Sequence, residues 1–191
     1  MSTQRLEAFS DAVIAIIITI LVLELSIPHE ATLVALAPLW PVFLSYVMSF
    51  VYLAIYWNNH HHMLHVTQQA NGAIMWANMH LLFWLSLFPF VTGWMGETNF
   101  AAKPAAVYGF VLLMAAVGYY VLERAIVNHE GKASHLRRLV GSDKKAKASI
   151  LLYVSGIGLA FLSNWIAIGV YTLVALMWLV PDRRIEAHAE K

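Results

Sequence analysis

Residues 5–26 read RLEAFSDAVIAIIITILVLELS, and this stretch predicts a helix that crosses a membrane. The twelve residues that follow Asp11 carry no charge, and nearly all of them are aliphatic. About 20 apolar residues are needed to cross about 30 Å of hydrocarbon. The residues before this stretch are polar and mixed in charge, and no small-residue cleavage site follows it. We therefore expect the segment to remain as a helix and not to be removed as a signal peptide.

The composition of the whole chain also favours a membrane protein. Of its 191 residues, 60% are hydrophobic and only 12% are charged, whereas about a quarter of the residues of a soluble domain are charged. No Asp, Glu, Lys or Arg occurs between Ala31 and Glu97. A water-soluble protein needs charged groups on its surface, so this region belongs in a lipid environment.

Six apolar segments are candidates for crossing the bilayer. The last two are separated only by Ser163 and Asn164, which predicts a tight helical hairpin; a single bent helix there would reduce the count to five. We predict an all-α integral membrane protein with six transmembrane helices, forming a single transmembrane domain over residues 1–191. The predicted spans lie near 5–26, 37–57, 72–93, 104–123, 148–163 and 165–181.

The distribution of Lys and Arg predicts the orientation of the chain. With six spans, eleven of these residues fall on one side of the membrane and Lys103 alone falls on the other. Cytoplasmic loops carry the excess of Lys and Arg, so we expect both termini and the 124–147 loop in the cytoplasm. The cytoplasmic set is Arg5, Arg124, Lys132, Arg137, Arg138, Lys144, Lys145, Lys147, Arg183, Arg184 and Lys191.

Several classes of function lack their sequence signature. The chain has no cysteine, which excludes disulfides and cysteine-based metal or catalytic sites. It contains no Thr-Val-Gly-Tyr-Gly filter, no phosphate-binding glycine loop and no Ser-x-x-Lys or His-Glu-x-x-His pair. A formal net charge of +1 does not indicate a nucleic-acid partner. We therefore expect that the protein is not an enzyme.

Among the ionisable residues of the first helix, we expect only Asp11 to need a hydrogen-bond partner from the protein. We expect Arg5, Glu7 and Glu24 at the membrane interfaces, where they are solvated. Asp11 is too short to reach far, so its carboxylate needs hydrogen-bond donors from the protein. The candidates are Arg5, the histidines of the turn between the second and third spans (His60, His61, His62 and His65), and Trp76, Asn78 and His80 of the third span.

A stripe of branched aliphatic residues runs along the same helix. Val13, Ile16, Ile20, Leu23 and Ile27 are spaced 3, 4, 3 and 4 residues apart, which keeps them on one face. At about 100° per residue, the Asp11 side chain points about 140° away from this stripe. The spacing alone favours ordinary helix packing or a lipid-facing surface for such a stripe, because branched aliphatic side chains are also what lipid-facing surfaces carry.

The histidines also raise the question of a metal. His61 and His65 are four residues apart on a helix, a spacing that can place two imidazoles on one ion. No cysteine and no carboxylate lies near them in the sequence, and histidines are common at membrane interfaces. We therefore expect no structural metal and no cofactor.

Residues Arg5 to Asp11 form the motif Arg-x-x-x-Phe-Ser-Asp at the start of the first helix. This motif resembles the signature of the transmembrane protein 175 family of cation channels, in its bacterial single-repeat form. Six predicted spans over nearly the whole chain and the histidine-rich end of the second span support the resemblance. Phe-Ser-Asp without that position and topology would be a weak signal.

The resemblance implies a potassium-selective channel in the bacterial inner (plasma) membrane, built as a homotetramer whose first helices line a central pore. It also implies that the channel has no carbonyl selectivity filter. In the family, a branched aliphatic residue five positions after the motif Asp narrows the pore, and here that residue is Ile16. Further hydrophobic rings are implied at Ile20 and Leu23, with Thr19 beside them and permeant potassium near Ile16 and Thr19. The resemblance thus favours the pore-lining interpretation of the stripe.

The family resemblance also implies a structural cluster around the motif. Its implied members are Arg5, Phe9, Ser10, Asp11, His61, His62, Asn78 and His80. An alternative function of a different class is a proton- or cation-coupled transporter, in which Asp11 and a partner histidine would titrate during transport.

Overall fold

The structure is a computed structural model that describes residues 3–131, 134, 136 and 144–179. Every regular element in this part of the chain is a helix, in agreement with the predicted fold class. The elements are α1 (Thr3–Leu23), the short 3-10 helix η1 (Leu33–Leu39), α2 (Trp40–His65), α3 (Gly72–Ser86), α4 (Phe88–Glu97), α5 (Ala102–Glu130), α7 (Lys144–Leu159) and α8 (Asn164–Leu179). Lys132, Arg137, Arg138, Arg183, Arg184 and Lys191 of the predicted cytoplasmic set, and the last residues of the span predicted over 165–181, lie outside the described residues.

The second helix is longer than the sequence predicted. Its apolar run ends near residue 57, but α2 continues to His65. The four histidines therefore lie on the last turns of a helix and not in a turn between helices. A helix satisfies its own backbone hydrogen bonds, so it does not have to stop where the hydrocarbon stops. Asn71 then begins the next helix, because its Oδ1 accepts a 2.9 Å hydrogen bond from the backbone N–H of Ile74.

The predicted single span over 72–93 is broken in two. Helices α3 and α4 meet at Leu87, and Pro89 stands in the first turn of α4. Proline has no backbone N–H, and its ring clashes with the carbonyl four residues earlier, so an unbroken helix through this point is unfavourable. The two helices together still form one apolar stretch, from Gly72 to Glu97.

Four stretches of the described chain are long and apolar enough to cross a membrane, so the protein is a multi-pass membrane protein. These are Thr3–Leu23, Leu33–His65, Gly72–Glu97 and Ala102–Glu130. The hairpin of α7 and α8 forms where the sequence predicted it, with 16 residues in each helix. At 1.5 Å per residue each helix is about 24 Å long, somewhat short of a bilayer core. Six crossings remain a prediction.

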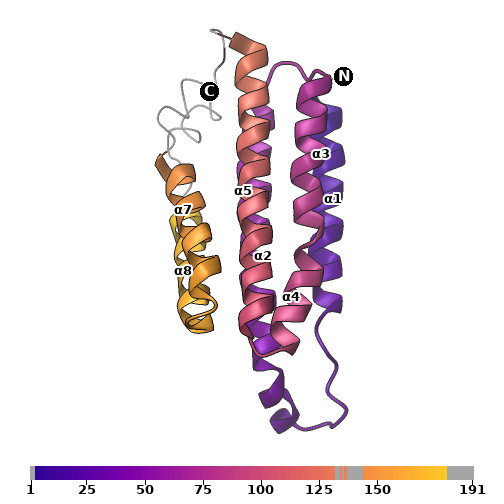
Figure 1. Cartoon of the computed structure of the whole chain (residues 1–191). Helices are drawn as coiled ribbons and strands as arrows, with labels where there is room; N and C mark the ends of the chain where they lie inside the picture. The colour runs from indigo at the N-terminus through magenta and orange to yellow at the C-terminus, as the bar shows by residue number, and fades with distance from the viewer. Residues whose placement is uncertain (1–2, 132–133, 135, 137–143, 180–191) are drawn as a thin grey trace.

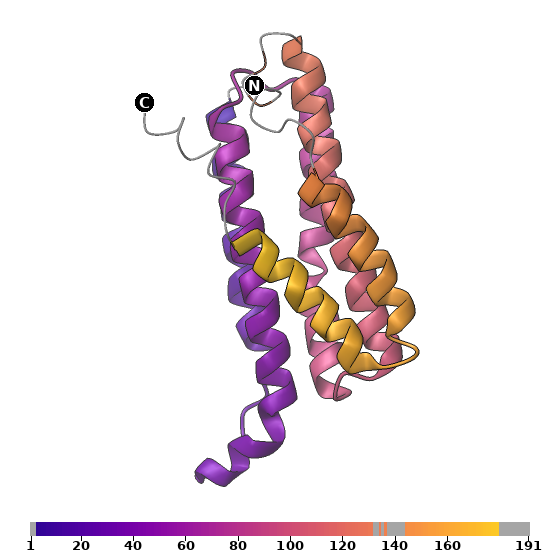
Figure 2. The same cartoon turned by 90° about the vertical axis from the view of Figure 1, so that its left-hand side faces the viewer.

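The helices pack into an elongated bundle (Figure 1). Helix α1 packs against α2, α3 and α4, while the α7–α8 hairpin packs against α5 on the other side. Figure 2 shows α8 crossing obliquely between α2 and α7. Tyr171 of α8 is buried in the centre, where Gly109 of α5 and Gly156 of α7 leave room for its ring. A Cβ atom at either glycine would overlap that ring, so these two positions let the hairpin approach the bundle closely.

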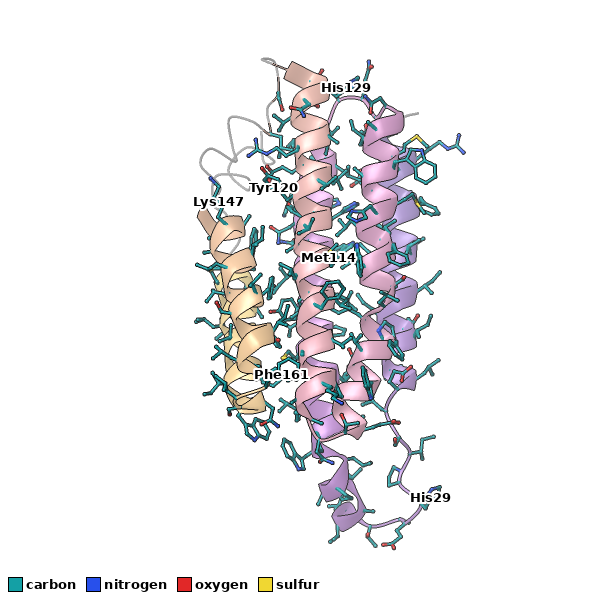
Figure 3. All side chains as sticks on the ribbon, viewed as in Figure 1. His29, Met114, Tyr120, His129, Lys147 and Phe161 are labelled. Atoms are coloured by element: carbon teal, nitrogen blue, oxygen red, sulfur yellow. The ribbon has the colours of Figure 1, made fainter. Side chains whose placement is uncertain are left out.

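One end of the bundle carries a cluster of aromatic rings, and the other carries the N-terminus of α1 and the turn between α2 and α3. Figure 3 shows His29 at one end and His129 at the other, with Lys147 near the level of Tyr120. Trp40, Phe100 and Trp165 meet toward the end that carries His29, with Trp40 and Trp165 stacked at a centroid distance of 5.9 Å. Aromatic rings of this kind are typical of membrane interfaces. The N-terminus of α1 and the turn between α2 and α3 lie at the end that carries His129 (Figure 1).

Candidate functional site

Helix α1 has one face that the rest of the chain covers. Ser10, Ile14, Ile17 and Leu21 follow a spacing of 4, 3 and 4 residues and are each at most 4% exposed. They pack against neighbouring helices that contribute Leu53, Ile74, Leu81 and other buried aliphatic side chains to the same core. This face fixes the rotation of α1 about its own axis, and so determines which residues point the other way.

The opposite face of α1 is uncovered, and it carries the predicted stripe. Ile16 is 57% exposed, Ile20 42% and Leu23 77%, although all three are large apolar side chains. Thr19 lies on the same side, and its hydroxyl donates a 2.8 Å hydrogen bond to the carbonyl oxygen of Ile16. Val13, at the edge of the stripe, is half-buried against the core. A single chain therefore leaves much of this aliphatic surface uncovered.

One side of the exposed face borders a shallow groove against α3 and α4. Ile16, Ile20 and Glu24 line it from α1 and the residues that follow, and Ser86 and Phe90 line it from the other side. Glu24 is half-buried, and its carboxylate lies against Gly93 of α4. The sequence predicted Glu24 to be simply solvated at an interface; the structure instead places it at the edge of the exposed face.

The centre of the motif cluster is a buried chain of hydrogen bonds. The Ser10 hydroxyl donates to the carbonyl oxygen of Leu6 at 2.8 Å and accepts from Asn78 Nδ2 at 2.9 Å. Asn78 Oδ1 lies 2.7 Å from His60 Nε2. Because the amide NH₂ of Asn78 donates to Ser10, its oxygen faces His60 and accepts, so His60 Nε2 is the donor. Ser10, Asn78 and His60 are fully buried. They join α1, α3 and α2 at one level. His60, predicted as a candidate donor to Asp11, bonds to Asn78 instead.

Asp11 binds a tryptophan and not the predicted histidine or asparagine. Its Oδ1 accepts a 3.0 Å hydrogen bond from the indole Nε1 of Trp57, one turn before His61 on α2. Trp57 was not among the candidate partners of Asp11 that the sequence offered. The spacing in the sequence could have indicated Trp57, because residues 57, 61 and 65 lie on one face of a helix and His61 and His65 were already candidates.

Glu7 also has a partner that the sequence did not predict. Its Oε1 lies 2.8 Å from His61 Nδ1, with the two side chains 18% and 41% exposed. The His61 ring stacks between Trp57 at 6.1 Å and His65 at 6.0 Å, measured between ring centroids. The His62 ring touches His61 edge-on at 5.6 Å. Glu7 is thus held between α1 and α2 and is not merely solvated.

Three predicted members do not join the cluster as expected. Arg5 is exposed and makes no hydrogen bond or ion pair to the described part of the chain. Phe9 is 46% exposed. His80 accepts a 3.0 Å hydrogen bond at Nε2 from Trp84 on its own helix, instead of reaching Asp11.

Comparison with known proteins places this arrangement in a family. Residues 5–89 match the family model described as the endosomal/lysosomal potassium channel TMEM175. The chain is 52% identical over 186 residues to a potassium channel of Chryseobacterium sp. (strain P1-3), covering 97% of each protein. It is 30% identical over 190 residues to a potassium channel of Chamaesiphon minutus, covering 91% of this chain and 92% of that protein.

A solved structure agrees with these relatives. The crystal structure of a lysosomal potassium-selective channel TMEM175 homolog from Chamaesiphon minutus superposes with a TM-score of 0.81 at 28% sequence identity. The match covers 94% of this chain and 97% of that one. The motif at the start of α1 lies inside the region that the family model matches. The chain therefore belongs to the TMEM175 family.

Proposed function

We propose that this chain is one subunit of a potassium-selective channel whose pore is lined by α1. The observation that carries the proposal is the uncovered face of Ile16, Ile20 and Leu23 on a helix whose opposite face is buried. Lipid can also cover an aliphatic face. Two observations favour a pore lining over a lipid-facing surface. The relatives are named potassium channels, and polar groups accompany the face, with Thr19 on it and Glu24 at its edge.

The proposed assembly is a homotetramer with four α1 helices around a central axis. In that arrangement Ile16 forms a ring at the narrowest point, with further rings at Ile20 and Leu23. Each ring would bring apolar side chains of four chains into van der Waals contact. Because lipid tails are as apolar as these side chains, packing of this kind would favour self-association in the bilayer, and not removal of the face from water.

The proposed conduction mechanism uses side chains in place of a carbonyl filter. A ring of isoleucines offers no ligand to a cation, so ions pass only when the ring widens enough to be hydrated, and closure acts by steric narrowing and dewetting. Potassium is less strongly hydrated than sodium, so it loses less on partial dehydration at the ring. The Thr19 hydroxyl, now bonded to the Ile16 carbonyl, could turn toward a partly dehydrated ion. Glu24 would raise the local cation concentration at the outer mouth.

The motif cluster has an architectural role in this proposal. The bonds from Ser10 to Asn78 and from Asp11 to Trp57 fix the rotation of α1 against α2 and α3. That rotation decides which residues face the pore. Asp11 is thus proposed to hold the pore helix and not to bind permeant ions.

The remaining features of the proposal concern location. The distribution of Lys and Arg supports both termini in the cytoplasm of a bacterium, with the channel in its inner membrane. The permeant ion is potassium, and we propose no cofactor.

A coupled transporter is the rival function. It would need Asp11 and a histidine to exchange protons, but the hydrogen bond of Asp11 goes to an indole, which does not titrate. His80, one of the candidate histidines, is bonded to Trp84. The contacts therefore support the channel more than the transporter.

The absence of cysteine makes the pore face directly testable. Leu23→Cys places a single thiol on the proposed pore face, and Leu162→Cys places one in the α7–α8 turn, where the side chain is similarly exposed at 82% against 77%. A charged, water-soluble thiosulfonate applied to channels in liposomes should reduce potassium flux through Leu23→Cys. It should leave flux through Leu162→Cys unchanged. Equal flux before and after labelling of Leu23→Cys would contradict the pore assignment.

A further inference from the structure

Three side chains that can bind a metal meet where α1 approaches the end of α2. Glu7 and Asp11 lie four residues apart on one face of α1, and His61 comes from α2. One ligand atom from each lies within 4.8 Å of the others. None of the three is fully buried, so an ion could reach them from the aqueous end of the bundle.

We propose that Glu7, Asp11 and His61 form a binding site for a transition-metal ion of the Zn²⁺ class. One imidazole nitrogen and two carboxylates match the ligands that Zn²⁺ takes when a water completes its four-coordinate shell. Ca²⁺ and Mg²⁺ prefer oxygen ligands throughout and would gain little from the imidazole. The donor set therefore selects for an ion that accepts nitrogen.

The distances require only a small adjustment. Zn²⁺ bonds of about 2.0–2.2 Å in a tetrahedron hold the ligand atoms about 3.4 Å apart. Glu7 Oε1 and His61 Nδ1 are 2.8 Å apart and would separate slightly. The remaining pairs, within 4.8 Å, would close by rotamer changes of partly exposed side chains. A metal-bound nitrogen must be unprotonated, so His61 Nδ1 would bind the ion only in the form that carries no proton on that nitrogen.

Neighbouring groups already orient two of the three ligands. The indole Nε1 of Trp57 bonds to Asp11 Oδ1, which leaves Oδ2 available for an ion. Stacking between Trp57 and His65 limits the rotation of the His61 ring. Such outer contacts commonly strengthen metal sites, so Trp57 is a positioning residue in this proposal.

This site departs from the sequence-based expectation of no metal. That expectation rested on the lack of a carboxylate near the histidines in the sequence. The carboxylates are supplied by α1, which only the packing of α1 against α2 brings close. A bound ion would cross-link the helix that carries Ile16 to α2. The binding itself does not depend on the proposed channel function.

The first test is zinc binding by titration calorimetry. The tag-free full chain in detergent, stripped with a chelator, should bind Zn²⁺, and His61→Asn and Glu7→Gln should each lower the affinity at least tenfold. His29→Asn is the matched control, because His29 is exposed at the opposite end of the bundle (Figure 3) and should leave binding unchanged. Equal zinc affinity in the wild type and in both cluster variants would overturn the proposal, as would displacement of Zn²⁺ by an equal concentration of Mg²⁺.

Two further measurements separate binding from folding. Zn²⁺ should raise the thermal unfolding temperature of the wild type and His29→Asn but not that of Glu7→Gln, a nearly isosteric variant. Trp57→Phe keeps a ring beside His61 and removes the N–H donor, so zinc affinity should fall by about tenfold. If Zn²⁺ raised the unfolding temperature of Glu7→Gln as much as that of the wild type, zinc would be stabilising the chain elsewhere, and the proposed site would be overturned. Unchanged affinity in Trp57→Phe would overturn the positioning role.

Discussion

The indole of Trp57 donates a 3.0 Å hydrogen bond to the carboxylate of Asp11, and this bond joins the second helix to the first. One turn earlier on α1 and one turn later on α2, Glu7 and His61 form a second contact, 2.8 Å long. The two contacts lie beside the buried chain of Ser10, Asn78 and His60. Together they hold α1 in the rotation that leaves its Ile16 face uncovered.

We predict that Trp57→Phe destabilises the protein. The change removes the indole donor of the Asp11 carboxylate; because the bond is exposed and water can replace it, the free energy of unfolding should fall by about 0.5–1.5 kcal/mol. Thermal unfolding in detergent with a chelator present measures the effect. Trp76→Phe is the control, because Trp76 is 78% exposed. If Trp57→Phe kept full stability and instead altered ion selectivity, Asp11 would belong to the conduction path.

The Ser10–Asn78–His60 chain predicts a larger loss. Asn78→Leu fills a similar volume but leaves His60 Nε2 without a partner in a fully buried site, while the Ser10 hydroxyl keeps its bond to the Leu6 carbonyl. One unpaired buried group costs about 1–3 kcal/mol, so the free energy of unfolding should fall by about 1–3 kcal/mol. Asn128→Leu, on the exposed surface of α5, should be nearly neutral. Equal melting temperatures for the two variants would show that the buried chain contributes little.

Close packing of α4 on α2 predicts a strong effect at Gly96. A Cβ atom there would lie 2.8 Å from Val42 Cα, a backbone atom that cannot move without shifting α2. Gly96→Ala should therefore lower stability by about 1–3 kcal/mol, as overpacking does. Gly72→Ala has nothing within 4 Å and should be neutral or slightly stabilising. Paired thermal unfolding curves test this, and a neutral Gly96→Ala would contradict the close approach of the two helices.

Features that depend on a single helix could be predicted from the sequence. The spacing identified the face of α1 that the structure leaves exposed at Ile16, Ile20 and Leu23, although Ile27, the last member of the predicted stripe, lies beyond the end of α1. The apolar runs located four long helical stretches. The sequence was less informative at helix ends, because α2 continues through His65 after its apolar run ends and Pro89 divides a continuous apolar stretch. Hydropathy reports whether a segment lies in lipid or in water. The end of a helix is instead the residue at which the backbone hydrogen bonds of the helix end, and hydropathy does not report that residue.

Contacts between helices were the hardest features to predict. Ser10, Asp11, His61 and Asn78 were identified as cluster members, but their pairing depends on the relative height and rotation of three helices. A shift of one turn, about 5.4 Å, exchanges Trp57 for His61 opposite a given residue of α1. This is why Asp11 was assigned a histidine or asparagine and binds Trp57, and why His80, which bonds Trp84, was included in the cluster.

We predict that Thr19→Val reduces ion discrimination without abolishing flux. Valine keeps the shape of threonine and removes the hydroxyl, which lies on the exposed face beside Ile16. In a homotetramer the substitution removes the hydroxyl from all four subunits, so discrimination should fall by at least about 1 kcal/mol, a factor of about five in the potassium-to-sodium ratio. Reversal potentials in planar bilayers measure that ratio. Thr172→Val, on α8, should leave it unchanged; an unchanged ratio in Thr19→Val would remove Thr19 from the mechanism.

The most direct test of the channel proposal compares potassium and sodium flux from purified protein in liposomes, for the wild type and for Ile16→Asn. Ile16 is 57% exposed in a single chain, so asparagine should fold there without a buried polar group. We expect the wild type to carry potassium faster than sodium, and Ile16→Asn to conduct more and discriminate less, because a polar ring is hydrated more easily. A wild type that carries neither ion, or a mutant with unchanged flux, would contradict a hydrophobic constriction at Ile16 and would favour the coupled transporter.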